Sequence, residues 1–184
     1  GLFLPDIQNH ALGIEVGEWV METALCQLDQ WRSAGRALPV SINLTGHHLQ
    51  HPRFMESLKA ALARHPQLAP GQLELEVLET SALEDISLVA HAITECAALG
   101  VSFALDDFGT GFSTLTYLKR LPAQTLKIDQ SFIRDMLCDP EDLAIVQGVL
   151  GLASAFKRRA IAEGAETLAH CQMLLDIGCD LAQG

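Results

Sequence analysis

The 184-residue chain has few basic residues, and this shortage limits the partners that its surface can bind. Lysine and arginine total 12 against 23 aspartates and glutamates, which gives a formal net charge of −11. This acidic balance argues against a surface that follows the phosphates of DNA or RNA. A phosphate ester in a cleft filled with metal ions remains compatible, because the ions reverse the local field.

The chain also lacks long apolar runs and paired cysteine motifs. No apolar run reaches the length of a membrane span, and the first residues lack the basic-then-apolar pattern of a secretory signal. We therefore expect a cytoplasmic location, which a tether to a membrane protein would not change, and no membrane contact by this segment. The five cysteines are scattered and form no Cys-x-x-Cys pair, which predicts reduced thiols rather than a disulfide framework or a zinc site.

What the sequence does contain is a regular alternation of two patterns. Hydrophobic residues make up 49% of the chain, enough for a sizeable core, and no linker divides it, so we interpret residues 1–184 as a single domain. Strand-like runs alternate with helical periodicity, which predicts βα units and a parallel sheet. The expected strands are 39–44, 73–79, 101–106, 125–129, 159–163 and 180–183. The expected helices are 14–31, 54–63, 86–99, 113–121, 130–137, 140–156 and 168–177.

Apolar and polar residues alternate within the clearest of these strands. Leu75 and Val77 face one way and Glu76 the other, because successive side chains of a strand point to opposite faces. Doubly wound sheets are apolar on both faces, so a barrel with outer helices and a polar inner rim fits better. The polar faces end, near the carboxyl ends of the strands, in Asn43, Glu76, Asp106 and Lys127.

The strand count predicts an incomplete barrel. A closed barrel needs eight strands and about 250 residues. We therefore expect an α/β fold, a modified TIM (β/α)8 barrel lacking its first strands, truncated at the N-terminus and also at the C-terminus. We also expect a polypeptide of these residues alone to be poorly stable and inactive.

The stretch Ala104–Ser113, ALDDFGTGFS, is the most informative segment. An apolar run ends in two adjacent carboxylates, Asp106 and Asp107, and a glycine-flanked loop follows. Adjacent carboxylates repel each other and resist burial as anions, so a cation is expected beside them, most simply a divalent metal. The alternative is a solvated acidic turn that caps a helix.

The strand ends together supply hard oxygen ligands that suit Mg²⁺ or Mn²⁺, namely Asn43, Glu76, Asp106 and Asp107. Two ions about 3.5–4 Å apart could bridge a phosphodiester and an attacking water.

Two charged residues could act beside those ions. Lys127 could orient or deprotonate the water, or stabilise the developing negative charge, and its alternative is a salt bridge to Asp129 or Asp106. Glu163 could hold a water or act as a base, and its alternative is to stabilise the helix that follows.

Six motifs in order along the chain resemble the EAL-domain phosphodiesterases of bacterial cyclic di-GMP signalling. They are SINLT (Ser41–Thr45), LELEVLET (Leu73–Thr80), ALDDFGTGFS, KIDQSFI (Lys127–Ile133), AEGAET (Ala162–Thr167) and the terminal GCDLAQG. The resemblance covers essentially the whole chain. It implies a modified TIM barrel that hydrolyses cyclic di-GMP to linear pGpG with two Mg²⁺ or Mn²⁺ ions. It also implies a homodimer and fusion to sensory or GGDEF domains outside this chain.

The resemblance also implies residue roles. Asp106 would be shared between the ions, with Asp107 on the second and Asn43 and Glu76 as further ligands. Lys127 would contact the nucleophilic water. The remaining roles implied are a base or water ligand for Glu163, a water contact for Gln183, a position near the guanine for Glu166, and support of the Asp107–Ser113 loop for Glu79.

Two departures from the family pattern favour an alternative function. The Glu-Ala-Leu segment, whose glutamate is a metal ligand in the family, is absent from these residues, and Leu78 replaces an expected threonine. A catalytically silent receptor that binds cyclic di-GMP and signals through a partner is therefore the second hypothesis. The histidines His47, His48 and His51 match no zinc spacing and are expected in a solvated loop and helix start.

Overall fold

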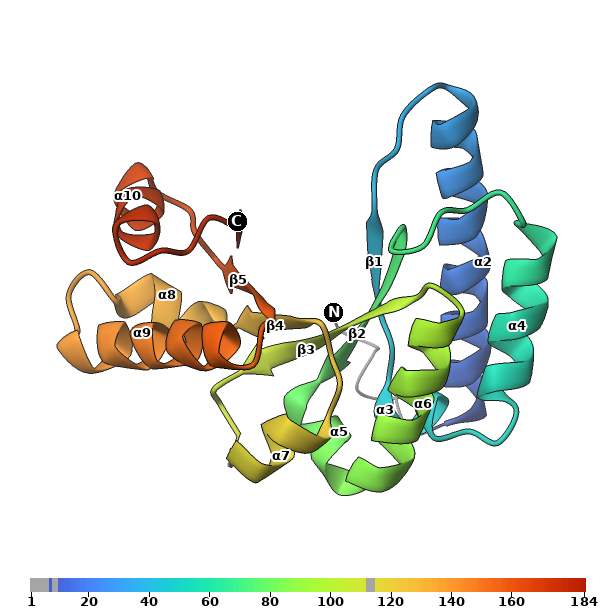
Figure 1. Cartoon of the computed structure of the whole chain (residues 1–184), viewed down its shortest axis with the longest axis horizontal. Coiled ribbons are helices and arrows are strands. Elements are labelled where there is room, and N and C mark those ends of the chain that lie inside the picture. The colour runs from blue at the N-terminus through green and yellow to red at the C-terminus, as the bar shows by residue number, and fades with distance from the viewer. Residues whose placement is uncertain (1–6, 8–9, 112–114) are drawn as a thin grey trace.

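One curled parallel sheet forms the centre of the molecule. The computed structural model describes residues 7, 10–111 and 115–184, and within them six strands pair in sequential order (Figure 1). They are β1 (Val40–Asn43), β2 (Leu73–Leu78), β3 (Ser102–Phe108), β4 (Thr125–Ile128), β5 (Arg159–Glu163) and β6 (Ala182–Gln183). Every neighbouring pair is parallel, so the predicted βα organisation is confirmed.

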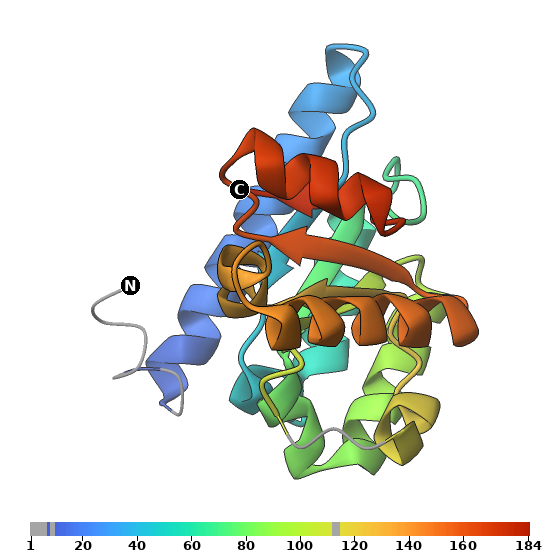
Figure 2. The same cartoon turned by 90° about the vertical axis from the view of Figure 1, so that its left-hand side faces the viewer.

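Helices connect the strands and pack on one face of the sheet. In the described residues, α2 packs on β1, α6 on β3, and α9 on β4 and β5, as Figures 1 and 2 show. The helices are α2 (Ala11–Ser33), α3 (Gly46–Leu49), α4 (Phe54–Arg64), α5 (Glu79–Glu84), α6 (Ile86–Ala98), α7 (Leu115–Arg120), α8 (Gln130–Asp135), α9 (Pro140–Ala155) and α10 (Leu168–Asp176).

Local capping chemistry explains where several helices begin. The Asp139 side chain accepts a hydrogen bond from the Glu141 N–H, and Pro140 occupies the first helical position of α9. Thr167 caps α10 in the same way through the His170 N–H. Both starts follow from the sequence because a side-chain acceptor satisfies an N–H that the helix leaves unpaired.

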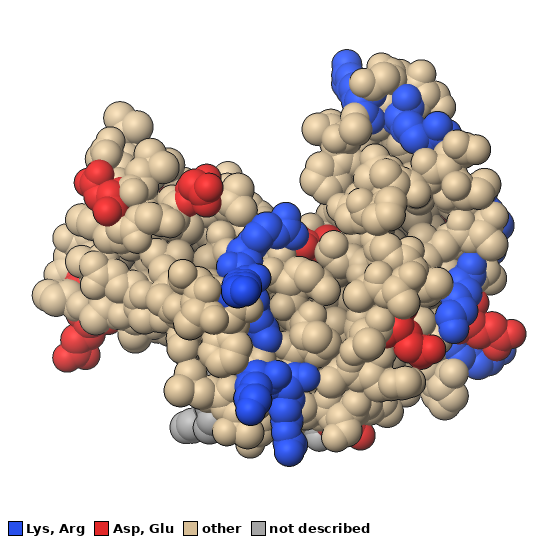
Figure 3. All heavy atoms as spheres, in the orientation of Figure 1, with Lys and Arg blue, Asp and Glu red and all other residues tan. Residues whose placement is uncertain are grey.

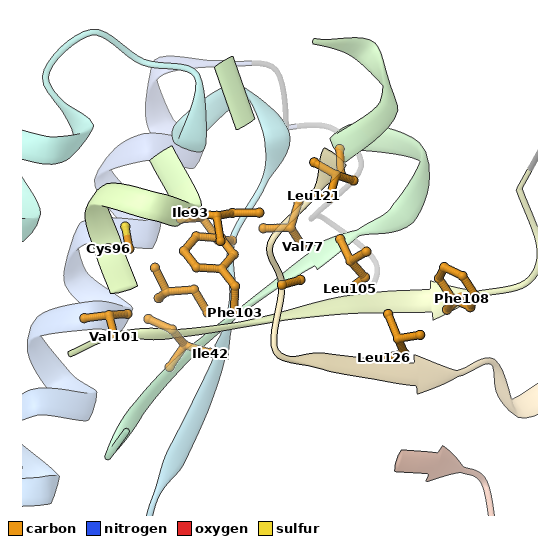
Figure 4. Close-up of a cluster of buried hydrophobic side chains, with 14 of the residues drawn as sticks. Ile42, Val77, Ile93, Cys96, Val101, Phe103, Leu105, Phe108, Leu121 and Leu126 are labelled. Carbon is orange, nitrogen blue, oxygen red and sulfur yellow. The ribbon is translucent and has the colours of Figure 1, made fainter. Parts of the chain in front are cut away.

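The hydrophobic core lies between the sheet and these helices. Phe103, Leu105 and Leu126 are fully buried, and Figure 4 shows them grouped with Val77 from β2 and Ile93 from α6. These residues have the outward parity predicted for their strands. Deleting a side chain such as that of Phe103 removes about 3–5 kcal/mol of stability, which makes this layer the scaffold that fixes the opposite, polar face.

The structure differs from the sequence prediction in the course of β3 and in two short helices. Strand β3 continues through both aspartates to Phe108, with an irregular register between Leu105 and Phe108, so a solvated acidic turn is wrong. The short helices α3 and α5 were not predicted, because four and six residues are too few to show helical periodicity. The first two residues of the expected helix 113–121 lie outside the described residues.

The described helices include none with the length and apolarity needed to cross a bilayer. All five cysteines are free thiols, as predicted. One expectation for the histidines is wrong, because His48 is 1% exposed and packs edge-on against Phe54 rather than facing solvent.

Candidate active site

A buried lysine joins carboxylates from three other strands at the carboxyl end of the sheet. The Lys127 Nζ on β4 lies 2.8 Å from Glu76 Oε2 on β2, 2.8 Å from Asp106 Oδ1 on β3 and 2.7 Å from Glu163 Oε1 on β5. Parallel register brings them together because the carboxyl ends of neighbouring strands meet at one edge. The four side chains thus form one charged cluster.

Burial makes these charges depend on one another. Lys127 is 3% exposed, and burial alone would lower its pKa, but hydrogen bonds to Asp106, Glu163 and Glu76 outweigh burial and hold the pKa above its ordinary value. Lys127 is therefore an ammonium at neutral pH in this arrangement. The salt bridge between Lys127 and Asp106, given above as the alternative to a functional role, is present. Any role of Lys127 in the reaction therefore has to operate together with this ion pair.

Asp107 adds a fourth carboxylate to the cluster. Carboxylate oxygens of Asp106, Asp107 and Glu163 all lie within 4.8 Å of one another. Burial, and then the neighbouring Asp106 charge, raise the pKa of Asp107. Burial likewise raises the pKa of Glu163, although Lys127 opposes this. Burial is the main cause of both shifts, and the neighbouring carboxylates add to it, since four acidic side chains surround one ammonium group.

The backbone at Asp107 is arranged to place this carboxylate in the cluster. Its φ of 53° is in the left-handed region, which non-glycine residues seldom adopt. The residue lies at the register irregularity of β3, where the strand departs from regular pairing with β4. Such an irregularity redirects a side chain at the end of a strand, and here both neighbouring aspartates remain near Glu163.

Glu79 contacts the loop that follows these aspartates. Its Oε2 accepts a hydrogen bond of 2.9 Å from the Gly109 N–H, and the residue is 1% exposed. A Cβ at Gly111 would lie 3.1 Å from the Glu79 carboxyl carbon, so this loop approaches the glutamate closely. The predicted contact between Glu79 and the loop is thus present at Gly109, whereas residues 112–114 lie outside the described residues.

A second polar layer, which the sequence did not predict, lies beneath the first. The Arg159 Nη2 donates to Glu74 Oε2 at 2.7 Å and to Thr125 Oγ1 at 2.8 Å. Thr125 Oγ1 and Ser41 Oγ also donate to the two oxygens of Glu74. The alternation of Glu74 with Glu76 gave a signal for this layer, but nothing identified Arg159 as the partner of Glu74. In Figure 3 the molecule is hollowed between the α9–α10 part and the α2–β1 part, and basic and acidic side chains meet there.

Three predicted site residues are not among the ion-paired groups of the lysine cluster, although Gln183 on β6 is the register partner of Glu163. Among the described residues, the side chains of Asn43, Glu166 and Gln183 make no hydrogen bond, and all three are exposed. Asn43 nevertheless lines a cavity of about 650 Å³ together with Glu76 and Leu78. Asn43 is also the register partner of Glu76, so their side chains lie on one face of the sheet.

The carboxylate oxygens at the carboxyl ends of the strands, which we call the rim, are suitable ligands for a hard divalent cation. Carboxylates from β2, β3 and β5 converge on one point, and an ammonium group occupies it here. Carboxylate and amide oxygens are the ligands that Mg²⁺ and Mn²⁺ prefer, and clustered acids with raised pKa values are stabilised by added positive charge. Asp106, Asp107 and Glu163 could hold such an ion, and Glu76 contacts the same lysine as Asp106 and Glu163.

Comparison with known proteins matches the chain, over its whole length, to the family that its sequence motifs resemble. The family model described as the EAL domain matches residues 1–184. The bifunctional diguanylate cyclase/cyclic di-GMP phosphodiesterase MucR of Pseudomonas aeruginosa is 39% identical over all of this chain and 27% of its own length. The cyclic di-GMP phosphodiesterase PA2567 of the same species is 36% identical over 99% of this chain and 31% of its own length. The chain therefore spans between a quarter and a third of these relatives.

A solved structure agrees with the sequence comparison. The PaMucR phosphodiesterase in complex with c-di-GMP superposes on the whole chain with a TM-score of 0.94 and 39% identity, and the chain covers 74% of it. The predicted fold class, a TIM-like barrel without its early strands, is confirmed by this match. The chain belongs to the EAL domain family.

Proposed function

We propose that this domain hydrolyses cyclic di-GMP to linear pGpG with the help of two Mg²⁺ or Mn²⁺ ions. The observation that carries the proposal is the cluster of Lys127 with Glu76, Asp106 and Glu163 at the carboxyl end of four parallel strands. The names of MucR and PA2567, and the c-di-GMP bound by PaMucR, support the choice of substrate.

The charge of each side chain at the carboxyl ends of the strands determines its proposed role. When bound, the metal ions supply positive charge for the phosphodiester and make an attacking water more acidic. Lys127 remains protonated in this cluster, so it donates a hydrogen bond to the water or to the developing negative charge and does not act as a base.

Glu163 is the better candidate for the base. Its raised pKa brings proton affinity closer to neutral pH, where a general base is most effective. Asn43, Glu76, Asp106 and Asp107 are the proposed metal ligands. Gln183 is proposed to contact water and Glu166 to lie near the guanine, roles to be tested by substitution.

Hydrolysis is tested with the full-length protein by following cyclic di-GMP and pGpG chromatographically. Asp106→Asn and Lys127→Ala should each abolish turnover, whereas Lys59→Ala, an exposed lysine on α4, should leave it unchanged. Undiminished turnover in the first two variants would contradict the assigned roles. Sedimentation equilibrium of the same protein tests the homodimer that the family resemblance implies.

The second candidate is a receptor that binds cyclic di-GMP without hydrolysing it. Leu78 favours it, because this residue ends β2 beside Glu76, lines the cavity and offers no hydroxyl for the adjoining loop. Calorimetry with and without Mg²⁺ separates the two functions. Tight binding that ignores the metal and yields no pGpG would favour the receptor.

A further inference from the structure

A histidine, a cysteine and a glutamate meet on the helical coat, outside the barrel rim. Glu22 and Cys26 lie one turn apart on α2, and His65 is the residue at which α4 ends. One potential ligand atom of each lies within 4.8 Å of the other two. These are the three kinds of side chain that bind Zn²⁺ in proteins.

The cluster lies away from the proposed active site. The chain reverses between α2 and β1, and α4 likewise precedes β2, so the ends of these helices lie near the beginnings of the strands (Figure 1). The Lys127 cluster lies at the opposite, carboxyl end of the sheet. A ligand bound by His65 would therefore not contact that cluster.

A carboxylate fixes the orientation of the His65 ring. The ring is 8% exposed, and its Nδ1 lies 2.6 Å from Asp29 Oδ2. The other ring nitrogen, Nε2, lies 3.4 Å from Glu22 Oε1. A carboxylate behind the ring is the usual companion of a metal-binding histidine, because it sets the tautomer and makes the free nitrogen more basic.

Glu22 is also held in place for this purpose. Its Oε2 accepts a hydrogen bond of 2.5 Å from the Arg64 Nη2, and its Oε1 lies 3.4 Å from both the Arg64 Nε and the His65 Nε2. The same hydrogen bond is the main reason that the pKa of Glu22 lies below its ordinary value, so the group is an anion at neutral pH. The Glu22 carboxylate and the His65 ring nitrogen beside it offer two donor atoms to a cation.

We infer that Glu22, Cys26 and His65 form a Zn²⁺ site, with Asp29 as the residue that positions His65. Tetrahedral zinc bonds of 2.0–2.3 Å place ligand atoms roughly 3.5 Å apart. The Glu22–His65 separation already matches, and Cys26 is exposed, so its side chain can turn to complete the set. The thiol releases its proton to solvent and binds as thiolate, and water takes the fourth position.

This site differs from the expectation drawn from the sequence. Scattered cysteines without a Cys-x-x-Cys pair predicted no zinc site, but the ligands here come from two helices separated by β1 and α3. Only the packing of α2 on α4 brings them together. A bound ion would link the two helices.

Cobalt(II) is a suitable probe because a thiolate ligand gives it a charge-transfer absorption that oxygen ligands do not. Titration of Co²⁺ into the intact domain should produce this band, saturating at one equivalent, and Zn²⁺ should displace it. Cys26→Ala should abolish the band, and Cys138→Ala, another exposed cysteine, should retain it. Asp29→Asn should weaken binding about 10- to 100-fold without removing the band.

The Co²⁺ titration of the wild-type protein tests the zinc site even if a variant folds poorly. Absence of the band, its persistence in Cys26→Ala, or failure of Zn²⁺ to displace Co²⁺ would each overturn the assignment. Asp106→Asn should leave the band intact, because the rim contributes no sulfur. Loss of cyclic di-GMP hydrolysis and loss of the zinc site are therefore separate results.

Discussion

At the scale of single residues, Lys127 is expected to contribute strongly to stability, because it pairs with three carboxylates while buried. Lys127→Met removes the one ammonium that pairs with Glu76, Asp106 and Glu163, and breaking a buried ion pair from one side costs about 3–5 kcal/mol. We expect this loss in urea denaturation without divalent metal, and Mg²⁺ should recover part of it. Lys59→Met is the exposed control. Equal stability of Lys127→Met and wild type would show that the cluster contributes no net stability.

Whereas substitution of Lys127 should lower the stability of the metal-free protein, substitution of Asp107 should raise it. Its folded-state pKa is raised, so it contributes stability below about pH 3.9, its unfolded value, and this contribution is lost as pH rises through the folded pKa. Asp107→Asn removes that penalty and suits the left-handed backbone, since asparagine tolerates a φ of 53°.

The metal-free Asp107→Asn protein should therefore be more stable than wild type at pH 7, by up to about 1 kcal/mol, and equally stable near pH 3. Thermal melts at the two pH values measure the difference. Asp107→Ala serves as the comparison, because it removes the same charge but keeps a strained backbone. A decrease in stability for Asp107→Asn at pH 7 would contradict the assigned cause.

At the scale of elements, the loop after β3 depends on Glu79 at the start of α5. Glu79→Ala leaves the Gly109 N–H without its acceptor, which costs about 1–3 kcal/mol for a buried donor. We expect metal affinity and turnover to fall by about 10- to 100-fold, as for other residues that orient metal ligands. Isothermal titration with Mg²⁺ and steady-state kinetics test this, and Glu79→Gln, which keeps an acceptor oxygen, should recover most of the loss.

The elements also show how much of this molecule can be read from its sequence. Strand parity placed Glu76, Asp106 and Lys127 on one face, and their convergence follows from parallel register. The partners of Glu74 and His65 could not be read in the same way. Arg159 reaches Glu74 across two strands, β3 and β4, and His65 meets α2 through helix packing. Both contacts therefore depend on three-dimensional distances that periodicity does not encode.

At the scale of the whole molecule, the proposed ions join strands that are distant in sequence. The proposed ligands from β1, β2 and β3 come together only in the folded sheet, so a cation that binds them stabilises the folded state by mass action. At a free Mg²⁺ concentration of 100 times Kd, the free energy of unfolding should rise by about 2.7 kcal/mol, and a chelator should reverse the gain. The intact domain is the protein to use, with unfolding followed in urea.

The matched variants make this linkage specific to the rim. Asp106→Asn should lose the Mg²⁺-dependent gain, because the central ligand becomes a neutral amide that competes poorly for a hard cation. Asp142→Asn, an acidic residue in the first turn of α9, should keep it. Cys26→Ala should also keep it, since Mg²⁺ prefers oxygen to sulfur. If Mg²⁺ raised the free energy of unfolding of Asp106→Asn as much as that of the wild type, Mg²⁺ would stabilise the fold at another place. The proposal that the carboxylates around Lys127 bind the ion would then be wrong.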